Sequence, residues 1–185
     1  MTTGADPGDL ARAVIRFWCE ELSPDQHWKK DPAVDRHIAE RFGRIRDEVL
    51  ASKAAGWRDD PETLAAAIIL LDQFSRNMFR GKARAFEGDP LALALCKEAL
   101  DRGWVDKLPK PLPTFFLMPL QHSENIEDQE RSVAEFRNRD PLNYKYAILH
   151  RDQIRRFGRF PGRNQALGRV STPEEREAIA RGETF

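Results

Sequence analysis

Dipeptides of Asp or Thr followed by Pro recur along the chain and predict helix starts. They include Asp31-Pro32, Asp60-Pro61, Asp89-Pro90, Asp140-Pro141 and Thr172-Pro173. An Asp or Thr side chain accepts hydrogen bonds from the unpaired N–H groups of a first helical turn, and proline fits the next position because no N–H is needed there. Thr172 and Glu175 also have the spacing of a capping box. Starts of this kind favour a fold built from short helices.

Between these starts, apolar residues recur at helical spacing. Val34, Ile38 and Phe42, for example, share one helical face and have charged residues opposite. Glycines that follow such runs predict where helices end, because glycine readily adopts the left-handed conformation of a helix terminus. These glycines are Gly56, Gly103 and Gly158.

No segment alternates between apolar and polar residues for long enough to predict a strand. We therefore expect an all-α fold of about eight helices in stacked antiparallel hairpins, similar to tetratricopeptide repeat proteins. The even spacing of Asp31, Asp60 and Asp89 suggests repeats, but the sequences between them do not match and the tetratricopeptide signature is missing. The expectation therefore concerns geometry and not sequence repetition.

Composition limits the domain count and the partners. The 185 residues fit a single helical domain over residues 1–185, with residues 1–8 expected to be disordered. The 30 basic and 30 acidic residues give no net charge, so no overall field attracts nucleic acid or a membrane surface. We expect no signal peptide, because the first ten residues lack a basic start and an apolar stretch, and no spanning segment, because the longest apolar run is too short. The two cysteines have no metal-binding spacing. We expect a cytoplasmic protein with no metal, cofactor, nucleic-acid or membrane partner.

The longest apolar run, Ala65–Leu71, leads directly into polar residues. Because the run is apolar on every side, it predicts a central buried helix that carries the polar residues with it. Asp72 then needs a partner, either Arg76 one turn later or an arginine from the C-terminal third. The group forms either a buried ion-pair network or the rim of a polar pocket. Its members are Asp72, Gln73, Arg76 and Asn77.

His122 and His150 are the candidates for acid–base chemistry, because imidazole titrates near neutral pH. Together with Glu124 and Asp152 they also offer metal-ligating side chains, but their spacing is not specific for a metal site. For each histidine the alternative is a structural, hydrogen-bonded side chain. His150 in particular shares its helical face with apolar residues.

The segment of residues 145–169 holds seven basic residues and one acidic residue, whereas residues 123–140 hold six acidic and three basic residues. Neighbouring helices usually pack together, so we expect residues 156–171 to form a basic loop that folds back on the core. Its arginines would pair with Glu124, Asp128 and Asp72 through bidentate hydrogen bonds. Any surplus of positive charge would accept an external anion.

Several long strings resemble the bacterial domain-of-unknown-function family 924. They are LLDQFSRN, MPLQHSENIEDQERS and HRDQIRRFGRFPGRNQALGR, and the likeness is collinear from about Val14 to Phe185. The resemblance implies an all-helical, tetratricopeptide-like fold and no established activity. The chain departs from the family pattern at Ser75, where the family usually has Pro, and at Gly162, where it commonly has His.

We expect a binding or interaction module with a charged groove that accepts a small anionic ligand or an acidic protein segment. Two alternatives stay open: a hydrolase acting on a phosphorylated or carboxylated small molecule, with His122 or His150 as the base, and a purely structural network of internal ion pairs. The residues expected to line the groove are Asp72, Gln73, Arg76, Asn77, His122, Glu124, Asp128, Arg151, Arg159, Arg163 and Asn164.

Overall fold

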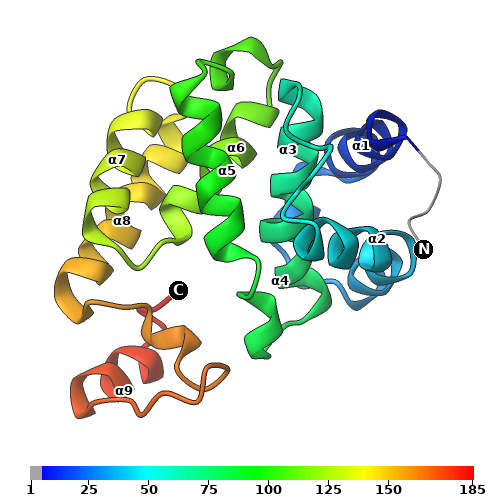
Figure 1. The fold of residues 1–185 in the computed structure, drawn as a ribbon. Coiled ribbons are helices and arrows are strands. Elements are labelled where there is room, and N and C mark those ends of the chain that lie inside the picture. The colour runs from blue at the N-terminus through cyan, green and yellow to red at the C-terminus, as the bar shows by residue number, and fades with distance from the viewer. Residues whose placement is uncertain (1–5) are drawn as a thin grey trace. The chain divides into compact units, whose positions relative to one another are not determined.

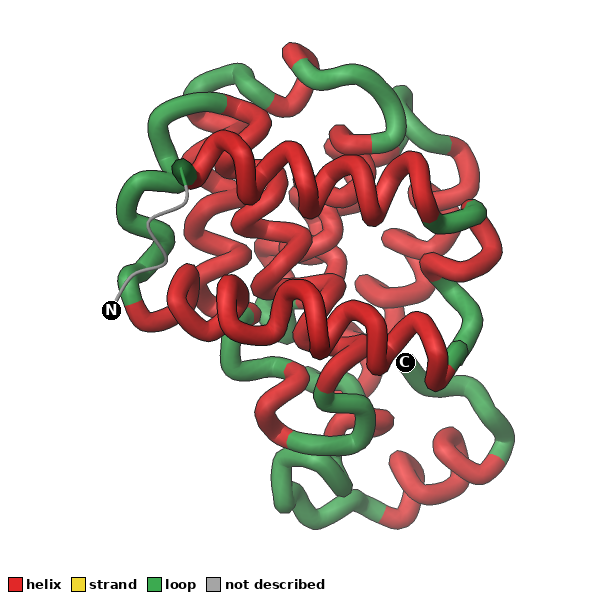
Figure 2. Tube along the Cα trace, turned by 90° about the vertical axis from the view of Figure 1, so that its right-hand side faces the viewer, coloured by secondary structure: helices red, strands yellow, loops and turns green. Residues whose placement is uncertain are grey.

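The structure, a computed structural model, describes residues 6–185. These residues form eight continuous helices joined by turns and short 3₁₀ segments, and none of them is in a strand (Figures 1 and 2). The all-α prediction is confirmed, while the likeness to tetratricopeptide repeats stays a prediction. Within the same residues, no helix combines the length and the apolar character that a membrane span requires.

The described chain divides into two compact units. Unit 1 comprises the residues up to Arg80 together with Arg84–Pro119, and unit 2 comprises Gly81–Ala83 and Leu120–Phe185. The expectation of one domain over residues 1–185 stays a prediction. Of the N-terminal residues expected to be disordered, residues 1–5 lie outside the described part, and residues 7 and 8 belong to the first turn of a helix.

Unit 1 is built around one long buried helix. Its elements are α1 (Pro7–Arg16), α2 (Pro32–Ala51), α3 (Pro61–Ile69), α4 (Ser75–Met78), α5 (Asp89–Asp101) and most of α6 (Leu112–His122). A π-helical turn at Leu70–Phe74 joins α3 and α4 into that one helix. α1 and α5 pack against α3, and α2 packs against the π-helical turn and α4. The residues of the predicted central run, Ala65–Leu71, are all buried, which confirms its position.

Unit 2 contains the end of α6 and three further helices. These are α7 (Ile126–Phe136), α8 (Pro141–Phe157) and α9 (Pro173–Ala180). α7 and α8 pack against each other, and a 3₁₀ turn at Pro161–Arg163 contacts α9. The buried side chain of Gln129 donates to the carbonyls of Gln121 at 2.8 Å and Ser123 at 2.7 Å. It thereby satisfies carbonyls that the end of α6 leaves without helical partners.

Most of the predicted helix starts are found in the structure. The side chains of Asp31, Asp60, Asp140 and Thr172 each accept a hydrogen bond from an N–H group of the following turn. Asp89 is different, because it is the first residue of α5 and does not cap it. Its carboxylate instead accepts two hydrogen bonds from Arg76, at 2.8 and 2.9 Å. The bidentate pair with a guanidinium joins two opposite charges through two hydrogen bonds, whereas in a cap only the carboxylate is charged.

Two of the three helix ends that glycines predicted are also found in the structure. Gly103 and Gly158 have φ angles of 63° and 69° and directly follow the C-terminal turns of α5 and α8. α2, in contrast, ends at Ala51, well before Gly56. Lys53 and Ala54 already adopt the left-handed conformation, with φ angles of 53° and 59°, and this terminates the helix earlier than the sequence indicated.

Arg46, on α2, is a completely buried charge in unit 1. Its Nε donates to the hydroxyl oxygen of Ser75 at 2.9 Å, and its guanidinium also pairs with Asp47 and Glu87. Ser75 lies where the resemblance to family 924 implies proline. Proline at this position would offer no hydroxyl, so the departure provides an acceptor for the buried guanidinium.

We expect Ser75→Ala to lower the free energy of unfolding by about 1–3 kcal/mol, because it leaves Arg46 Nε buried without this acceptor. Urea-induced unfolding followed by circular dichroism measures the change. Ser52→Ala is the matched control, since Ser52 is exposed and its hydroxyl bonds only to a local carbonyl. Equal effects of the two substitutions would show that the hydroxyl of Ser75 does not support Arg46.

Candidate functional site

The predicted polar residues of the central helix form a buried ion-pair network in unit 1. Asp72 is completely buried, and its Oδ1 lies 2.8 Å from Arg76 Nη1. Gln73 Nε2 donates to the other carboxylate oxygen at 2.6 Å. Burial acts to lower the pKa of Arg76, but the charges of Asp72 and Asp89 outweigh it and raise that pKa above its usual value. Of the two partners that the sequence left open for Asp72, the structure shows Arg76.

Asn77 takes part in a different contact. Its Nδ2 donates to Oδ1 of Asp35 at 2.8 Å, and Arg80 pairs with the same carboxylate. This contact ties α4 to the first turn of α2. Asn77 therefore has a structural partner separate from the Asp72 network.

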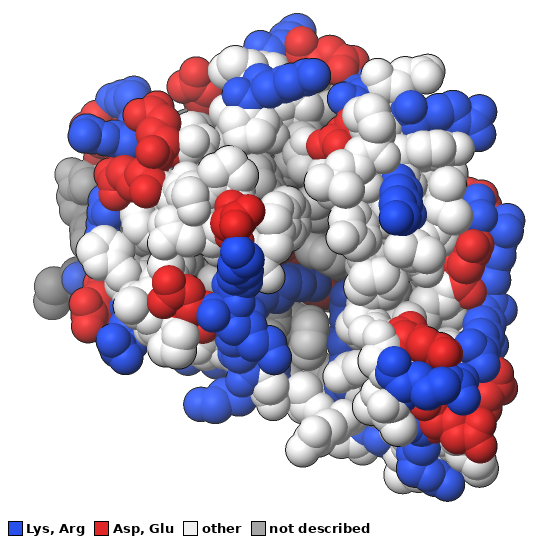
Figure 3. Space-filling view, turned by 180° about the vertical axis from the view of Figure 1, so that it is seen from behind, with Lys and Arg blue, Asp and Glu red and all other residues white. Residues whose placement is uncertain are grey.

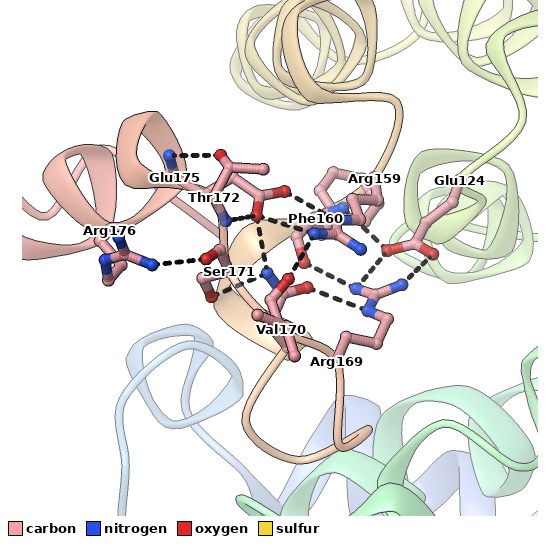
Figure 4. Close-up of polar contacts among 10 residues, drawn as sticks. Glu124, Arg159, Phe160, Arg169, Val170, Ser171, Thr172, Glu175 and Arg176 are labelled. Atoms are coloured by element: carbon pink, nitrogen blue, oxygen red, sulfur yellow. Dashed lines mark hydrogen bonds and ion pairs between the residues drawn. The ribbon is translucent and has the colours of Figure 1, made fainter.

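The arginine-rich loop of unit 2 folds onto the turn between α6 and α7. Glu124, in that turn, accepts two hydrogen bonds from Arg169, at 2.7 and 3.0 Å, and one from the N–H of Phe160 at 2.8 Å (Figure 4). Burial acts to raise the pKa of Glu124, but these three hydrogen bonds and the positive charges nearby lower it overall. The predicted contact between the loop and Glu124 is thus present, and Arg169 makes it.

Glu175, at the start of α9, is the second carboxylate that the arginine-rich loop contacts, and it is buried. Its side chain accepts two hydrogen bonds from Arg159, at 2.7 and 2.8 Å, and one from the N–H of Thr172 at 2.8 Å (Figure 4). Mainly because of the hydrogen bonds from Arg159, which outweigh burial, its pKa is lowered to about 2. The capping box that the sequence predicted is present, and its glutamate also pairs with the basic loop.

Asn164 connects the two carboxylates. Its Oδ1 accepts a hydrogen bond from Arg169 Nε at 2.9 Å, while its Nδ2 donates to Glu175 at 3.2 Å. The side chain is buried. Glu124, Arg169, Asn164, Glu175 and Arg159 therefore form one continuous chain of polar contacts, which we call the loop network.

Two members of the loop network, Arg169 and Glu175, are absent from the groove residues predicted from the sequence. Both lie in stretches with visible signals: Arg169 closes the arginine-rich tract, and Glu175 completes the capping box. The spacing of a capping box indicates a helix start but does not reveal a second partner that is distant in sequence. Arg159 lies 16 positions before Glu175.

Other predicted groove residues make separate pairs. Asp128 accepts a hydrogen bond from the Ser123 hydroxyl at 2.8 Å. Arg151 pairs with Asp152 at 2.8 Å and with Glu130 at 3.8 Å. In the space-filling view, most basic side chains on the visible face lie beside acidic ones (Figure 3). Much of the charge in the predicted groove is therefore matched locally.

The two candidate histidines lie near each other in unit 2. The ring centroids of His122 and His150 are 6.3 Å apart, and the ring of Phe160 stands edge-on to His150 at 5.5 Å. The Arg163 guanidinium lies over the Phe160 ring at 4.5 Å and donates to the carbonyl of His122 at 2.8 Å. We call these four residues the histidine centre.

The tautomer of His150 follows from its backbone partner. Nδ1 lies 2.8 Å from the carbonyl oxygen of Tyr146, one helical turn earlier. A carbonyl oxygen can only accept, so Nδ1 carries the hydrogen and Nε2 is the accepting nitrogen of the neutral ring. His150 therefore combines a fixed orientation with a nitrogen that can accept a proton.

The loop network positions the histidine centre through Phe160. The N–H of this completely buried residue donates to Glu124, and its carbonyl accepts from Arg169 at 2.9 Å. The same ion pair thus holds both polar groups of the Phe160 backbone. Because His150 and Arg163 both contact the Phe160 ring, the Glu124–Arg169 pair also determines the environment of these two side chains. Among residues 6–185, no three His, Cys, Asp or Glu side chains gather in a way that could hold a metal ion.

The pKa of Glu175 predicts how stability depends on pH. It is about 2 in the folded protein and 4.5 when unperturbed. The ion pair with Arg159 therefore contributes fully above pH 4.5, and its contribution is lost as the pH falls from 4.5 through 2. We expect Glu175→Gln to lower the free energy of unfolding by about 2 kcal/mol at pH 7, and by progressively less below pH 4.5. Urea unfolding at pH 7, 4 and 3 measures this.

Glu174→Gln is the control for this prediction, because Glu174 is exposed and pairs only at the surface with Arg156. We expect it to change the free energy of unfolding by less than about 0.5 kcal/mol at pH 7. A penalty for Glu175→Gln that is the same at pH 3 and pH 7 would contradict the assigned pKa.

Comparison with known proteins agrees with this architecture. A solved structure of a protein of unknown function, ATU0120 from Agrobacterium tumefaciens, matches with a TM-score of 0.91 and 38% sequence identity, over 96% of this chain and 100% of that chain. No match was found among curated proteins. The model of a family described as bacterial protein of unknown function, DUF924, matches residues 14–183. Because this match spans nearly the whole sequence, the chain belongs to the DUF924 family.

Proposed function

We propose that this protein is a helical ligand-binding module whose histidine centre accepts a small anion. The observation that carries the proposal is that the buried ring of Phe160 contacts both the His150 imidazole and the Arg163 guanidinium, while the His122 ring lies 6.3 Å from the His150 ring. A guanidinium donates charge-assisted hydrogen bonds to phosphate and carboxylate oxygens, and His150 can donate one from Nε2 when that nitrogen has taken up a proton. His122, His150 and Arg163 are therefore the groups expected to bind the anion.

This proposal is narrower than the charged groove expected from the sequence. Arg159, Glu124 and Asn164 serve the loop network, in which carboxylates already match the arginine charges. These three residues are therefore assigned to the loop network and not to the proposed anion site. The histidine centre is also compact, and His150 is buried. Both features favour a small ligand over an acidic protein segment.

The position of Arg163 supports a role in binding. One of its terminal nitrogens is anchored on the His122 carbonyl at 2.8 Å, and its planar group lies over the Phe160 ring. These contacts restrict the side chain before a ligand arrives. A guanidinium held in advance loses less conformational entropy on binding, and affinity increases accordingly.

We expect inorganic phosphate and citrate to bind the protein and to raise its melting temperature, because a ligand that binds only the folded state stabilises it. Arg163→Met should reduce the affinity at least about tenfold, since one charge-assisted hydrogen bond is lost. Isothermal titration calorimetry and thermal-shift titration with the two anions measure these effects.

Arg155→Met is the matched control, because Arg155 is an exposed arginine of the same unit that pairs with Glu130. It should leave the affinity unchanged. Absence of binding by both anions, or equal losses in the two arginine variants, would exclude an anion site at the histidine centre and favour a purely structural role for the charges.

A second candidate function, hydrolysis of a phosphorylated or carboxylated small molecule, is favoured by the orientation of His150. The hydrogen bond from Nδ1 to the Tyr146 carbonyl makes Nε2 the accepting nitrogen, as a general base requires. In this function, Arg163 would hold the anionic group of the substrate.

If the protein is a hydrolase, His150→Gln should reduce the turnover of p-nitrophenyl phosphate about 100-fold or more, because a general base contributes at least this factor. The release of p-nitrophenolate gives the rate. His37→Gln is the control, since His37 is an exposed histidine of unit 1. Turnover that is absent in the wild type, or equal in the two variants, would rule out this second function.

A further inference from the structure

The last residues of the chain turn back from α9 toward α8. Gly182 has a φ of 68°, and its N–H donates to the Ile179 carbonyl at 3.0 Å. The N–H of Glu183 donates to the Ala178 carbonyl, also at 3.0 Å. This glycine-directed end redirects the chain out of the helix. We call residues 182–185 the strap.

The strap lies directly on the histidine centre. The Phe185 ring stacks on the His150 ring with 3.7 Å between the centroids and 19° between the planes. Phe160, in contrast, contacts the His150 ring edge-on and does not stack on it. His150 is therefore enclosed by two aromatic rings, and one of them belongs to the strap.

The side chain of Gln153 binds backbone groups of the strap. Its Nε2 donates to the Glu183 carbonyl at 2.9 Å, and its Oε1 accepts from the N–H of Phe185 at 3.2 Å. Both ends of one side-chain amide thus pair with backbone groups two residues apart. Gln153 is buried on α8, one turn from His150.

Gly162 leaves the space that the strap needs. A Cβ atom at this position would lie 2.2 Å from the main-chain oxygen of Phe185, closer than any real contact. The backbone of Gly162 does not have a positive φ, so its conformation is open to other residues. The close approach of the strap is therefore the feature that requires glycine here.

The contacts of the strap are few and partly exposed. Phe185 is 42% exposed, and Glu183 pairs with two exposed arginines, Arg156 and Arg181. A groove of about 440 Å³ also runs between the strap and α8. Two neutral hydrogen bonds, one ring stack and the exposed ion pairs of Glu183 must offset the entropy of ordering four residues, and exposed ion pairs contribute little. The closed position is therefore only marginally stable, and the strap can open without unfolding the helices.

We propose that residues 182–185 are a strap that closes over His150 and must move aside before a ligand can reach this histidine. The strap covers one face of the imidazole, is held by Gln153 and fits only because position 162 is glycine. Its effect on ligand affinity rests on the proposed function, whereas its closure over His150 does not. Closure is therefore tested by a measurement that needs no ligand.

The test is the rate at which diethylpyrocarbonate modifies His150 in the full chain, measured by mass spectrometry against His37 as an exposed internal reference. Phe185→Ala removes the stacked ring, and Gly162→Ala pushes the strap away sterically. Each should speed modification of His150 roughly three- to tenfold, the factor expected from losing one aromatic contact. Val170→Ala, at an 87% exposed apolar residue of unit 2, should leave the rate unchanged.

The outcomes separate the strap from the anion site. Unchanged modification of His150 in both strap variants, with folding verified by circular dichroism, would overturn the strap, whatever the phosphate affinity. Modification as fast as that of His37 in the wild type would overturn it as well. Faster modification in the variants supports the strap even if calorimetry detects no phosphate binding, and in that case only the proposed anion site fails. If phosphate binds, opening the strap should raise its affinity by the same factor.

Discussion

The bidentate pair between Glu124 and Arg169 is the interaction on which the architecture of unit 2 depends. It joins the turn after α6 to a loop 45 residues later, and both partners also hold the backbone of Phe160. Phe160 in turn contacts His150 and Arg163. One ion pair thus determines the course of the loop and the surroundings of the histidines. Partly buried charges can serve in this way because their geometry is restrictive, even where their net contribution to stability is small.

The same solution to buried charge recurs in unit 1. Asp72 is neutralised by Arg76 within its own helix, and the buried guanidinium of Arg46 uses the Ser75 hydroxyl in addition to two carboxylates. The buried charges of unit 1 and those of the loop network in unit 2 thus have partners in their own unit. A chain rich in arginine therefore need not carry a broad basic surface, and positive charge by itself is a poor guide to its ligand.

Function is better sought where polar groups combine with aromatic rings. In the histidine centre, Phe160 contacts the His150 ring and the Arg163 guanidinium, and His122 lies beside His150. The strap adds Phe185 to one face of His150. Gly162 connects the two features, because the absence of its side chain leaves room for the strap. We propose that the anion and the strap occupy the same space beside α8 in turn, so that they compete.

The sequence by itself determined the helices, because their signals are local. An Asp or Thr before a proline caps the turn that follows, and a run such as Ala65–Leu71 must be buried wherever it lies. Asp89 shows the limit of such signals, because its carboxylate pairs with Arg76, 13 residues earlier, and does not cap α5. Only the tertiary structure decided that Glu124 meets Arg169 and that Phe185 covers His150. Every arginine of the loop offers the same donors, and which one reaches a given carboxylate depends on how distant segments pack.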